Sequence, residues 1–167
     1  NTYIGYDAGR YNVTGTYNTT VGFESGMNAT GSSNSFFGYQ AGKGGTTSAP
    51  FSSGQNNTAL GYQALTAFTT AGGNTAIGYQ SGDSITTGGN NALLGYQAGS
   101  ALVGGGTNIA IGYQPLYLGT ANSNAIAIGG RAGYNSQASY NVYVGYSAGR
   151  ENRAGVSQVY IGNQAGY

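Results

Sequence analysis

Carboxylates are the first side chains to consider for acid–base catalysis, because the chain has four acidic residues and no His or Cys. Asp7 and Glu24 occupy equivalent positions in successive copies of a repeat, so stacking the copies would bring them together and raise the pKa of one carboxylate. A catalytic pair also needs an enclosing pocket and a partner base, which the sequence does not offer. We therefore expect a solvated edge near Arg10 and predict that the chain is not an enzyme.

Metal, nucleic-acid and membrane sites lack their usual residues. Gly104-Gly105-Gly106 is not followed by the Asp that calcium-binding, glycine-rich rolls place in each turn. The five basic residues are scattered and the net charge is +1, so no basic stripe could neutralise a phosphate backbone. No window approaches the roughly 20 apolar residues of a membrane span. We predict no metal, no cofactor, no nucleic-acid partner and no membrane insertion.

A repeat of about 17 residues organises the chain, and its clearest copies read NTAIGYQSG from Asn74 and NALLGYQAG from Asn91. Ten glycines mark the copies, at positions 5, 22, 38, 61, 78, 95, 112, 129, 145 and 162. This period is too short for helical repeats, and 33 glycines also disfavour helices. We predict an all-β fold, a parallel β-solenoid or β-roll of ten coils, forming one domain over residues 1–167 with two short strands per coil.

A short run of β-branched, aromatic or small residues precedes each glycine, as in Thr75-Ala76-Ile77. The residue directly before the glycine is apolar in every copy, so we assign it to the interior of the roll, with Ile77 and Ile111 as examples. The residue one position earlier then points outward and is also mostly apolar. Because a solvent-facing row should be polar, this pattern predicts association between chains.

Three columns of identical side chains are predicted to run along the solenoid as structural ladders. The leading Asn should form hydrogen bonds to its equivalents about 4.8 Å away, and the glycine should adopt a backbone conformation closed to other residues or allow a close approach. The tyrosine after the glycine should stack as an aromatic column. The ladder residues are Asn18, Asn34, Asn57, Asn74, Asn91, Asn108, Asn141, Gly78, Gly95, Gly112, Tyr62, Tyr79, Tyr96 and Tyr113, and Tyr6, Phe23, Tyr39 and Tyr146 extend the aromatic column.

Irregularities in the repeat carry their own predictions. One spacing of 23 residues places an inserted loop at residues 43–55, which should project from an edge as the most exposed candidate for binding. Asn124 lies five rather than four residues before its glycine, which predicts a bulge or an altered turn. Threonine pairs at 46–47, 69–70 and 86–87 should stack in three consecutive coils. Neither end has a distinct polar cap, so we expect a longer polypeptide or end-to-end stacking.

The string N-[TS]-x-[IVL]-G-[YF]-Q-[AS]-G resembles the head repeats of trimeric autotransporter adhesins and the N-T-A-I-G-Y-Q-A arrays of bacteriophage tail-fibre-like proteins. Nearly the whole chain is covered, and residues 74–82 and 91–99 match best, whereas Leu65, Leu116, Gly130 and Asn163 depart from the pattern. The resemblance implies a left-handed roll, a homotrimer with apolar stripes facing the three-fold axis, and a role in adhesion or in spanning distance.

The features together predict a structural fibre or adhesin segment, a rigid rod for extension and surface attachment that is extracellular, on the cell surface or part of a virion. Self-association is the expected partnership, as a homotrimer or an end-to-end filament, with a cell-surface receptor or glycan as a further partner. A self-assembling extracellular filament subunit fits the same residues. The short threonine column leaves an ice-binding solenoid as another alternative.

Overall fold

The protein is a β-solenoid with one three-residue strand in each coil. The computed structural model describes residues 1–47 and 49–167. Its strands are β1 (Thr2–Ile4), β2 (Thr19–Val21), β3 (Ser35–Phe37), β4 (Thr58–Leu60), β5 (Thr75–Ile77), β6 (Ala92–Leu94), β7 (Ile109–Ile111), β8 (Ile126–Ile128), β9 (Val142–Val144) and β10 (Val159–Ile161). Over these described ranges, no helix has the length and apolar character needed to cross a membrane.

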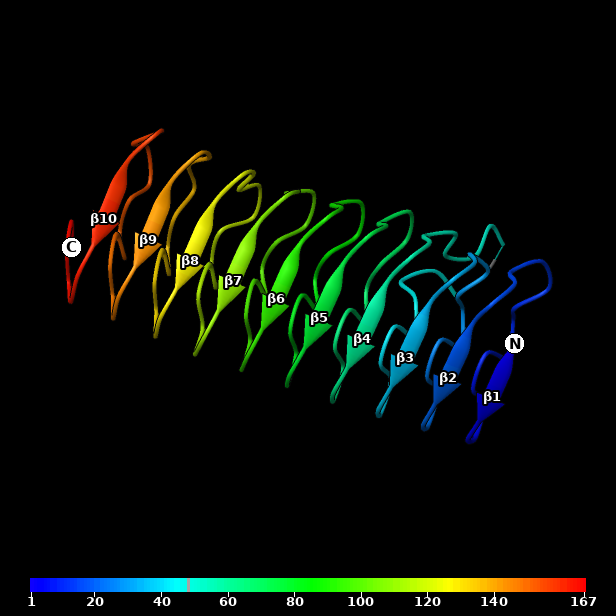
Figure 1. The fold of residues 1–167 in the computed structure, drawn as a ribbon. Coiled ribbons are helices and arrows are strands. Elements are labelled where there is room, and N and C mark those ends of the chain that lie inside the picture. Colours follow the sequence, from blue (N-terminus) through cyan, green and yellow to red (C-terminus); the bar gives the residue numbers. More distant parts are fainter. Residues whose placement is uncertain (48) are drawn as a thin grey trace.

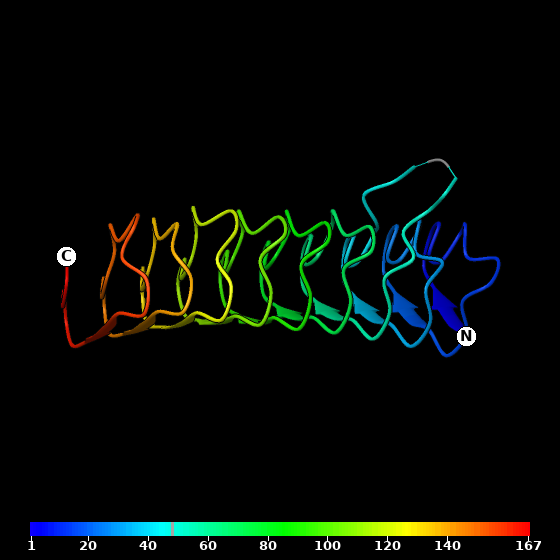
Figure 2. The same cartoon turned by 90° about the horizontal axis from the view of Figure 1, so that it is seen from above.

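The ten strands form a single parallel sheet in sequence order, so each coil lies beside the coil that precedes it (Figure 1). Pairing is in register throughout, with Thr58 opposite Thr75 and Leu60 opposite Ile77. Seen from above, the sheet forms one side of an elongated rod and the turns form the other (Figure 2). The predicted parallel solenoid with coils of about 17 residues is therefore confirmed.

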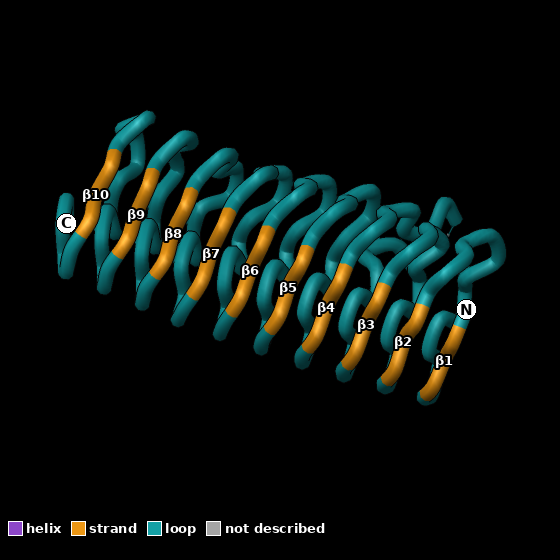
Figure 3. The backbone as a smooth tube through the Cα atoms, viewed as in Figure 1, coloured by secondary structure: helices purple, strands orange, loops and turns teal. Residues whose placement is uncertain are grey.

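The expectation of two strands per coil is wrong for the described residues, because each coil contributes one strand and otherwise consists of turns (Figure 3). Residues with positive φ break up the second side: Gln80 has φ 49° and Gly82 has φ 59°. Such left-handed residues cannot belong to an extended strand. Backbone hydrogen bonds still join the coils here, as from Gly99 N–H to the Pro115 carbonyl at 2.9 Å and from Val103 N–H to the Thr120 carbonyl at 2.9 Å.

The interior of the roll is lined by the middle residue of each strand, and the predicted orientation of the strands is wrong. Ala76 and Ala110 are fully buried, whereas Ile111 is 36% exposed and Ile77 is only partly buried. The reason is the leading Asn: Asn74 is buried, and strand alternation puts it on the same face as Ala76, two residues on. Ile77 and Ile111 therefore face outward.

Small and large residues complement one another inside this thin core. Ala59 and Ala76 leave room for Phe68 and Ile85, which lie on the turn side and are fully buried. Where the strand residue is large, as at Phe36, its ring lies 5.6 Å from the ring of Phe68 in the adjoining coil. Of the two apolar strand positions, the less hydrophobic middle position is therefore the buried one, because the interior of the roll is narrow.

The two irregular regions behave differently from one another. The inserted loop projects from the rod near its N-terminal end, as predicted (Figure 2), and Phe51 stacks on Tyr11 at 4.9 Å. Residue 48 of the predicted loop lies outside the described residues. The expected bulge or altered turn at Asn124 is wrong: β8 keeps its register, Ala125 takes the place of the ladder Asn, and Asn124 has φ 54° at the position that Asn90 fills with φ 59° in another coil.

Candidate interaction surface

The outward side chains of β1–β10 form one flat, uncharged surface, which we call the strand face. It consists of the first and third residue of each strand, and several of its members are among the most exposed apolar residues of the chain. Leu60 is 48% exposed and Leu94 is 46% exposed, at the centre of the rod. At about 4.8 Å per coil and about 3.3 Å per residue, this face measures roughly 48 by 10 Å. No acidic or basic residue interrupts it.

The first-position row of the strand face changes character along the rod. In β1–β5 it carries hydroxyl side chains, and in β6–β10 it carries only aliphatic ones. The hydroxyl residues are Thr2, Thr19, Ser35, Thr58 and Thr75, and the aliphatic ones are Ala92, Ile109, Ile126, Val142 and Val159. The third-position row is apolar from Ile4 to Ile161. The face therefore has a polarity gradient with a defined direction.

Aromatic rings stack in a continuous column that follows the strand face, one residue beyond each strand-ending glycine. Successive ring centroids are 5.0–5.3 Å apart and the ring planes differ by 5–11°. This aromatic column comprises Tyr6, Phe23, Tyr39, Tyr62, Tyr79, Tyr96 and Tyr113. Gly130 stands in the next position and interrupts it, so the predicted inclusion of Tyr146 is wrong.

Buried asparagines form the ladder that the sequence predicts, and it binds backbone as well as side chains. The Asn74 side-chain NH₂ donates to Asn57 Oδ1 at 3.2 Å and to the Gly88 carbonyl at 3.0 Å. Asn74 Oδ1 accepts from the backbone N–H of Asn91 at 3.0 Å and from its side-chain NH₂ at 3.0 Å. The Oδ1 atoms of five further asparagines likewise accept a hydrogen bond from the backbone N–H of the equivalent residue in the next coil: Asn18, Asn34, Asn57, Asn91 and Asn108. Ala125 ends this run, and Asn141 restarts it by accepting from the Gln158 backbone N–H at 2.7 Å.

The repeat glycine meets both conditions that its sequence position suggests. Gly78, Gly95 and Gly112 have φ of 128°, 132° and 131°, a region that L side chains rarely adopt. A Cβ on Gly78 would also press against the carbonyl oxygen of Gly95 in the next coil. Glycine therefore lets the chain turn a sharp corner directly beside its neighbour.

A row of glutamines, which the sequence reasoning missed, runs beside the aromatic column. Gln80 Nε2 donates to Gln63 Oε1 at 3.1 Å, and Gln97 Nε2 donates to Gln80 Oε1 at 3.0 Å. This glutamine row comprises Gln40, Gln63, Gln80, Gln97 and Gln114. Its signal is the Gln two residues after the glycine in six copies of the repeat, of which the five from Gln40 to Gln114 form this row. All of its bonds point the same way along the rod.

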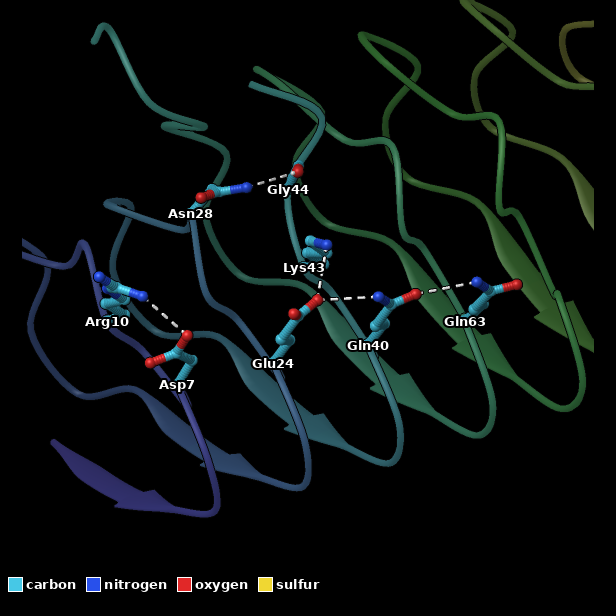
Figure 4. A network of polar contacts seen from close by, with 8 residues as sticks. All are labelled: Asp7, Arg10, Glu24, Asn28, Gln40, Lys43, Gly44 and Gln63. Carbon is cyan, nitrogen blue, oxygen red and sulfur yellow. Dashed lines mark hydrogen bonds and ion pairs between the residues drawn. The ribbon is translucent and has the colours of Figure 1, made fainter. Parts of the chain in front are cut away.

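Glu24 terminates this row, and its partners are Gln40 and Lys43 rather than Asp7 (Figure 4). Gln40 Nε2 donates to Glu24 Oε2 at 2.8 Å, and Lys43 Nζ lies 2.6 Å from the same oxygen. Lys43, and after it Gln40, hold the pKa of Glu24 below its ordinary value rather than raising it. Asp7 instead forms an ion pair with Arg10 at 2.8 Å. The two carboxylates are thus neutralised separately.

The predicted threonine column holds in two of its three coils, those of Thr69 and Thr86. Thr69 Oγ1 donates to the Thr86 carbonyl at 2.9 Å, and Thr86 Oγ1 donates to the Val103 carbonyl at 3.3 Å. In the preceding coil it is Ser53, not Thr46 or Thr47, whose N–H donates to the Thr69 carbonyl, at 2.7 Å. The insertion displaces residues 46–47 out of the column, which spacing from the glycine alone could not reveal.

The part of the chain that the structure describes contains no pocket and no group of three metal-ligating side chains. Its prominent features are instead the strand face and the ladders beside it. No protein-family model, curated protein or solved structure matches the chain. The resemblance to trimeric autotransporter heads and phage fibre repeats therefore stays a prediction, and the surfaces themselves carry the functional argument.

Proposed function

We propose that the chain is a rigid structural segment of an extracellular or virion fibre, in which three copies pack side by side through their strand faces. The carrying observation is that face: an uncharged, largely aliphatic strip of roughly 480 Å² that runs the length of the rod. Exposed apolar patches of about 300–600 Å² on a monomer are often functional. Packing against other copies would remove this strip from water.

Parallel packing of the copies follows from the polarity gradient of the first-position row. When all copies point the same way, hydroxyl residues such as Thr58 meet hydroxyl residues, and aliphatic residues such as Ile109 meet aliphatic ones. An antiparallel pair would set Thr19 against Val142 and so lose that match. A closed, cyclic arrangement of parallel copies satisfies the pattern, and the homotrimer implied by the repeat resemblance is the simplest such arrangement for rods with one flat face.

Stiffness is the property that such a fibre would use for extension and surface attachment. Each coil is joined to the next by strand pairing and by turn hydrogen bonds such as that from Gln97 N–H to the Tyr79 carbonyl at 2.8 Å, and most coils also by the asparagine ladder. Bending the rod would require several of these bonds to break together. A receptor or glycan would then be bound at the fibre's exposed turns or at the inserted loop, where sequence and structure are least regular.

The mass of the assembly in solution tests this proposal. We expect sedimentation velocity and light scattering to give a trimer for the unaltered chain and a monomer for L60K/I77K, which places two lysines on the strand face. The matched control is T70K/T87K, which adds the same charges in adjacent coils on the turn side, at exposed positions. It should stay trimeric. A monomeric unaltered chain, single-roll filaments, or equal behaviour of the two variants would contradict the proposal.

A further inference from the structure

The aromatic column places phenol rings in direct succession, which is an uncommon arrangement with a chemical consequence. Five consecutive members are tyrosines: Tyr39, Tyr62, Tyr79, Tyr96 and Tyr113. Their centroids are 5.0–5.3 Å apart and their planes differ by 6–10°, so successive rings are nearly parallel and one coil apart. Each ring is also about half exposed, between 42% and 50%. An oxidant can therefore reach every phenol in the row.

We propose that this row is a site of oxidative modification, at which neighbouring tyrosines are joined into dityrosine between consecutive coils. The co-reactant is hydrogen peroxide used by a haem peroxidase, which acts as a one-electron oxidant of phenols. Two neighbouring phenols each lose one electron to the oxidant and one proton to water. The two phenoxyl radicals then combine by forming a carbon–carbon bond between ring carbons ortho to the oxygens.

The products balance without any further reagent. Each coupled ring loses the hydrogen from its bonding carbon and regains its phenol, so each cross-link removes two electrons and two protons overall. One peroxide accepts them and leaves as two waters. Coupling requires one ring to tilt toward the next from a separation near 5 Å, and each of these tyrosines is only about half covered by the rest of the chain.

The column contains its own non-reacting neighbours, which define where cross-links should stop. Phe23 separates Tyr6 from Tyr39 at one end and has no phenol to oxidise. Gly130 leaves a gap between Tyr113 and Tyr146 at the other end. Tyr6 and Tyr146 are more exposed than the inner tyrosines, at 68% and 54%. Stacking therefore predicts reaction at the inner rings, and exposure alone predicts it at these outer ones.

The consequence would be a row of covalent staples along one edge of the rod. Each staple would link residues one coil apart, as between Tyr62 and Tyr79, and would hold neighbouring coils together when their hydrogen bonds break. This inference does not depend on the proposed trimer, because the reacting rings belong to a single chain.

Peroxidase treatment of the dilute folded chain, followed by peptide mass spectrometry, tests the proposal. We expect peptides joined at 39–62, 62–79, 79–96 or 96–113, with the mass deficit of two hydrogens and dityrosine fluorescence. In Y62F/Y96F each remaining column tyrosine has only Phe neighbours, so Tyr39, Tyr79 and Tyr113 should form no cross-links with one another. The matched control Y6F/Y146F removes two more exposed phenols and should retain them.

The Tyr-to-Phe variants should fold, because the aromatic column of the unaltered chain already contains a phenylalanine, Phe23. Treatment in guanidinium chloride gives a second comparison, because unfolding separates the rings and should abolish the preference for neighbours. Cross-links confined to pairs of different chains, cross-links among Tyr39, Tyr79 and Tyr113 in Y62F/Y96F, or the same pattern from the unfolded chain would overturn the proposal.

Discussion

Replacing Asn74 by Ala should destabilise the solenoid far more than its small change in volume suggests. Asn74 is fully buried, and its side chain forms hydrogen bonds with two buried backbone groups, the Asn91 N–H at 3.0 Å and the Gly88 carbonyl at 3.0 Å. Each orphaned group costs about 1–3 kcal/mol, so the free energy of unfolding should fall by about 2–6 kcal/mol. Asn57 Oδ1 keeps its bond from the Asn74 backbone N–H, so that acceptor adds little.

Urea unfolding followed by circular dichroism measures this loss, and amide hydrogen exchange at Asn91 locates it. The control is T70A, which changes an exposed residue on the turn side and should alter stability by no more than about 0.5 kcal/mol. A loss below about 1 kcal/mol for N74A, or protection at Asn91 unchanged from the unaltered chain, would show that water or a shifted backbone replaces the ladder and would refute the reasoning.

Three further substitutions probe the neighbouring columns. G78A should cost about 3 kcal/mol or prevent folding, because Gly78 has φ 128° and a Cβ would press on the Gly95 carbonyl; an unaltered urea midpoint would rule this out. Q80A removes two bonds of the partly buried glutamine row and should cost about 1–2 kcal/mol, against no change for the exposed T87A. E24Q should cost at most about 1 kcal/mol at neutral pH. The folded-state pKa of Glu24 is lowered, so its contribution to stability is present above the ordinary carboxyl pKa and disappears as pH falls through the folded-state pKa. The free energies of unfolding of E24Q and of the unaltered chain should therefore converge in acid. A constant difference between them down to about pH 3 would exclude the Lys43 interaction as its source.

The repeat made the coil predictable from sequence because every copy carries the same turn and ladder signals. Glycine at Gly78 and its equivalents, asparagine at Asn74 and tyrosine at Tyr79 each recur once per coil, and in-register stacking of like residues needs only that recurrence. The structure confirms the asparagine ladder, the strained glycine and most of the aromatic column. These are local features repeated, so a single correct unit determines all of them.

The orientation of the strand could not be read from hydrophobicity alone. Ile77 is more apolar than Ala76, yet Ala76 is buried and Ile77 faces outward. The decisive residue is Asn74, whose amide is fully hydrogen-bonded inside the roll, and a polar side chain was not expected to define the interior face. Assembly would reverse the usual preference, since an outward Ile in a monomer becomes an inward Ile between copies.

Irregularities in the repeat explain most of the remaining differences between the sequence prediction and the structure. The insertion after Lys43 moves Thr46 out of the turn column, and Ala125 replaces an asparagine without changing the register of β8. In both cases the outcome depends on where in the coil the extra or substituted residue is accommodated. Counting residues from the glycine does not show which position of the coil each residue occupies. The glutamine row was overlooked for a different reason, because a Gln in a turn ordinarily points into solvent.

Cryo-electron microscopy of the purified assembly, viewed down its long axis, tests the account most directly. We expect three rolls in each cross-section, all pointing the same way, with Leu60, Ile77 and Leu94 gathered at the centre and the turns on the outside. A cross-section containing one roll, with these side chains in contact with solvent along the whole rod, would contradict it.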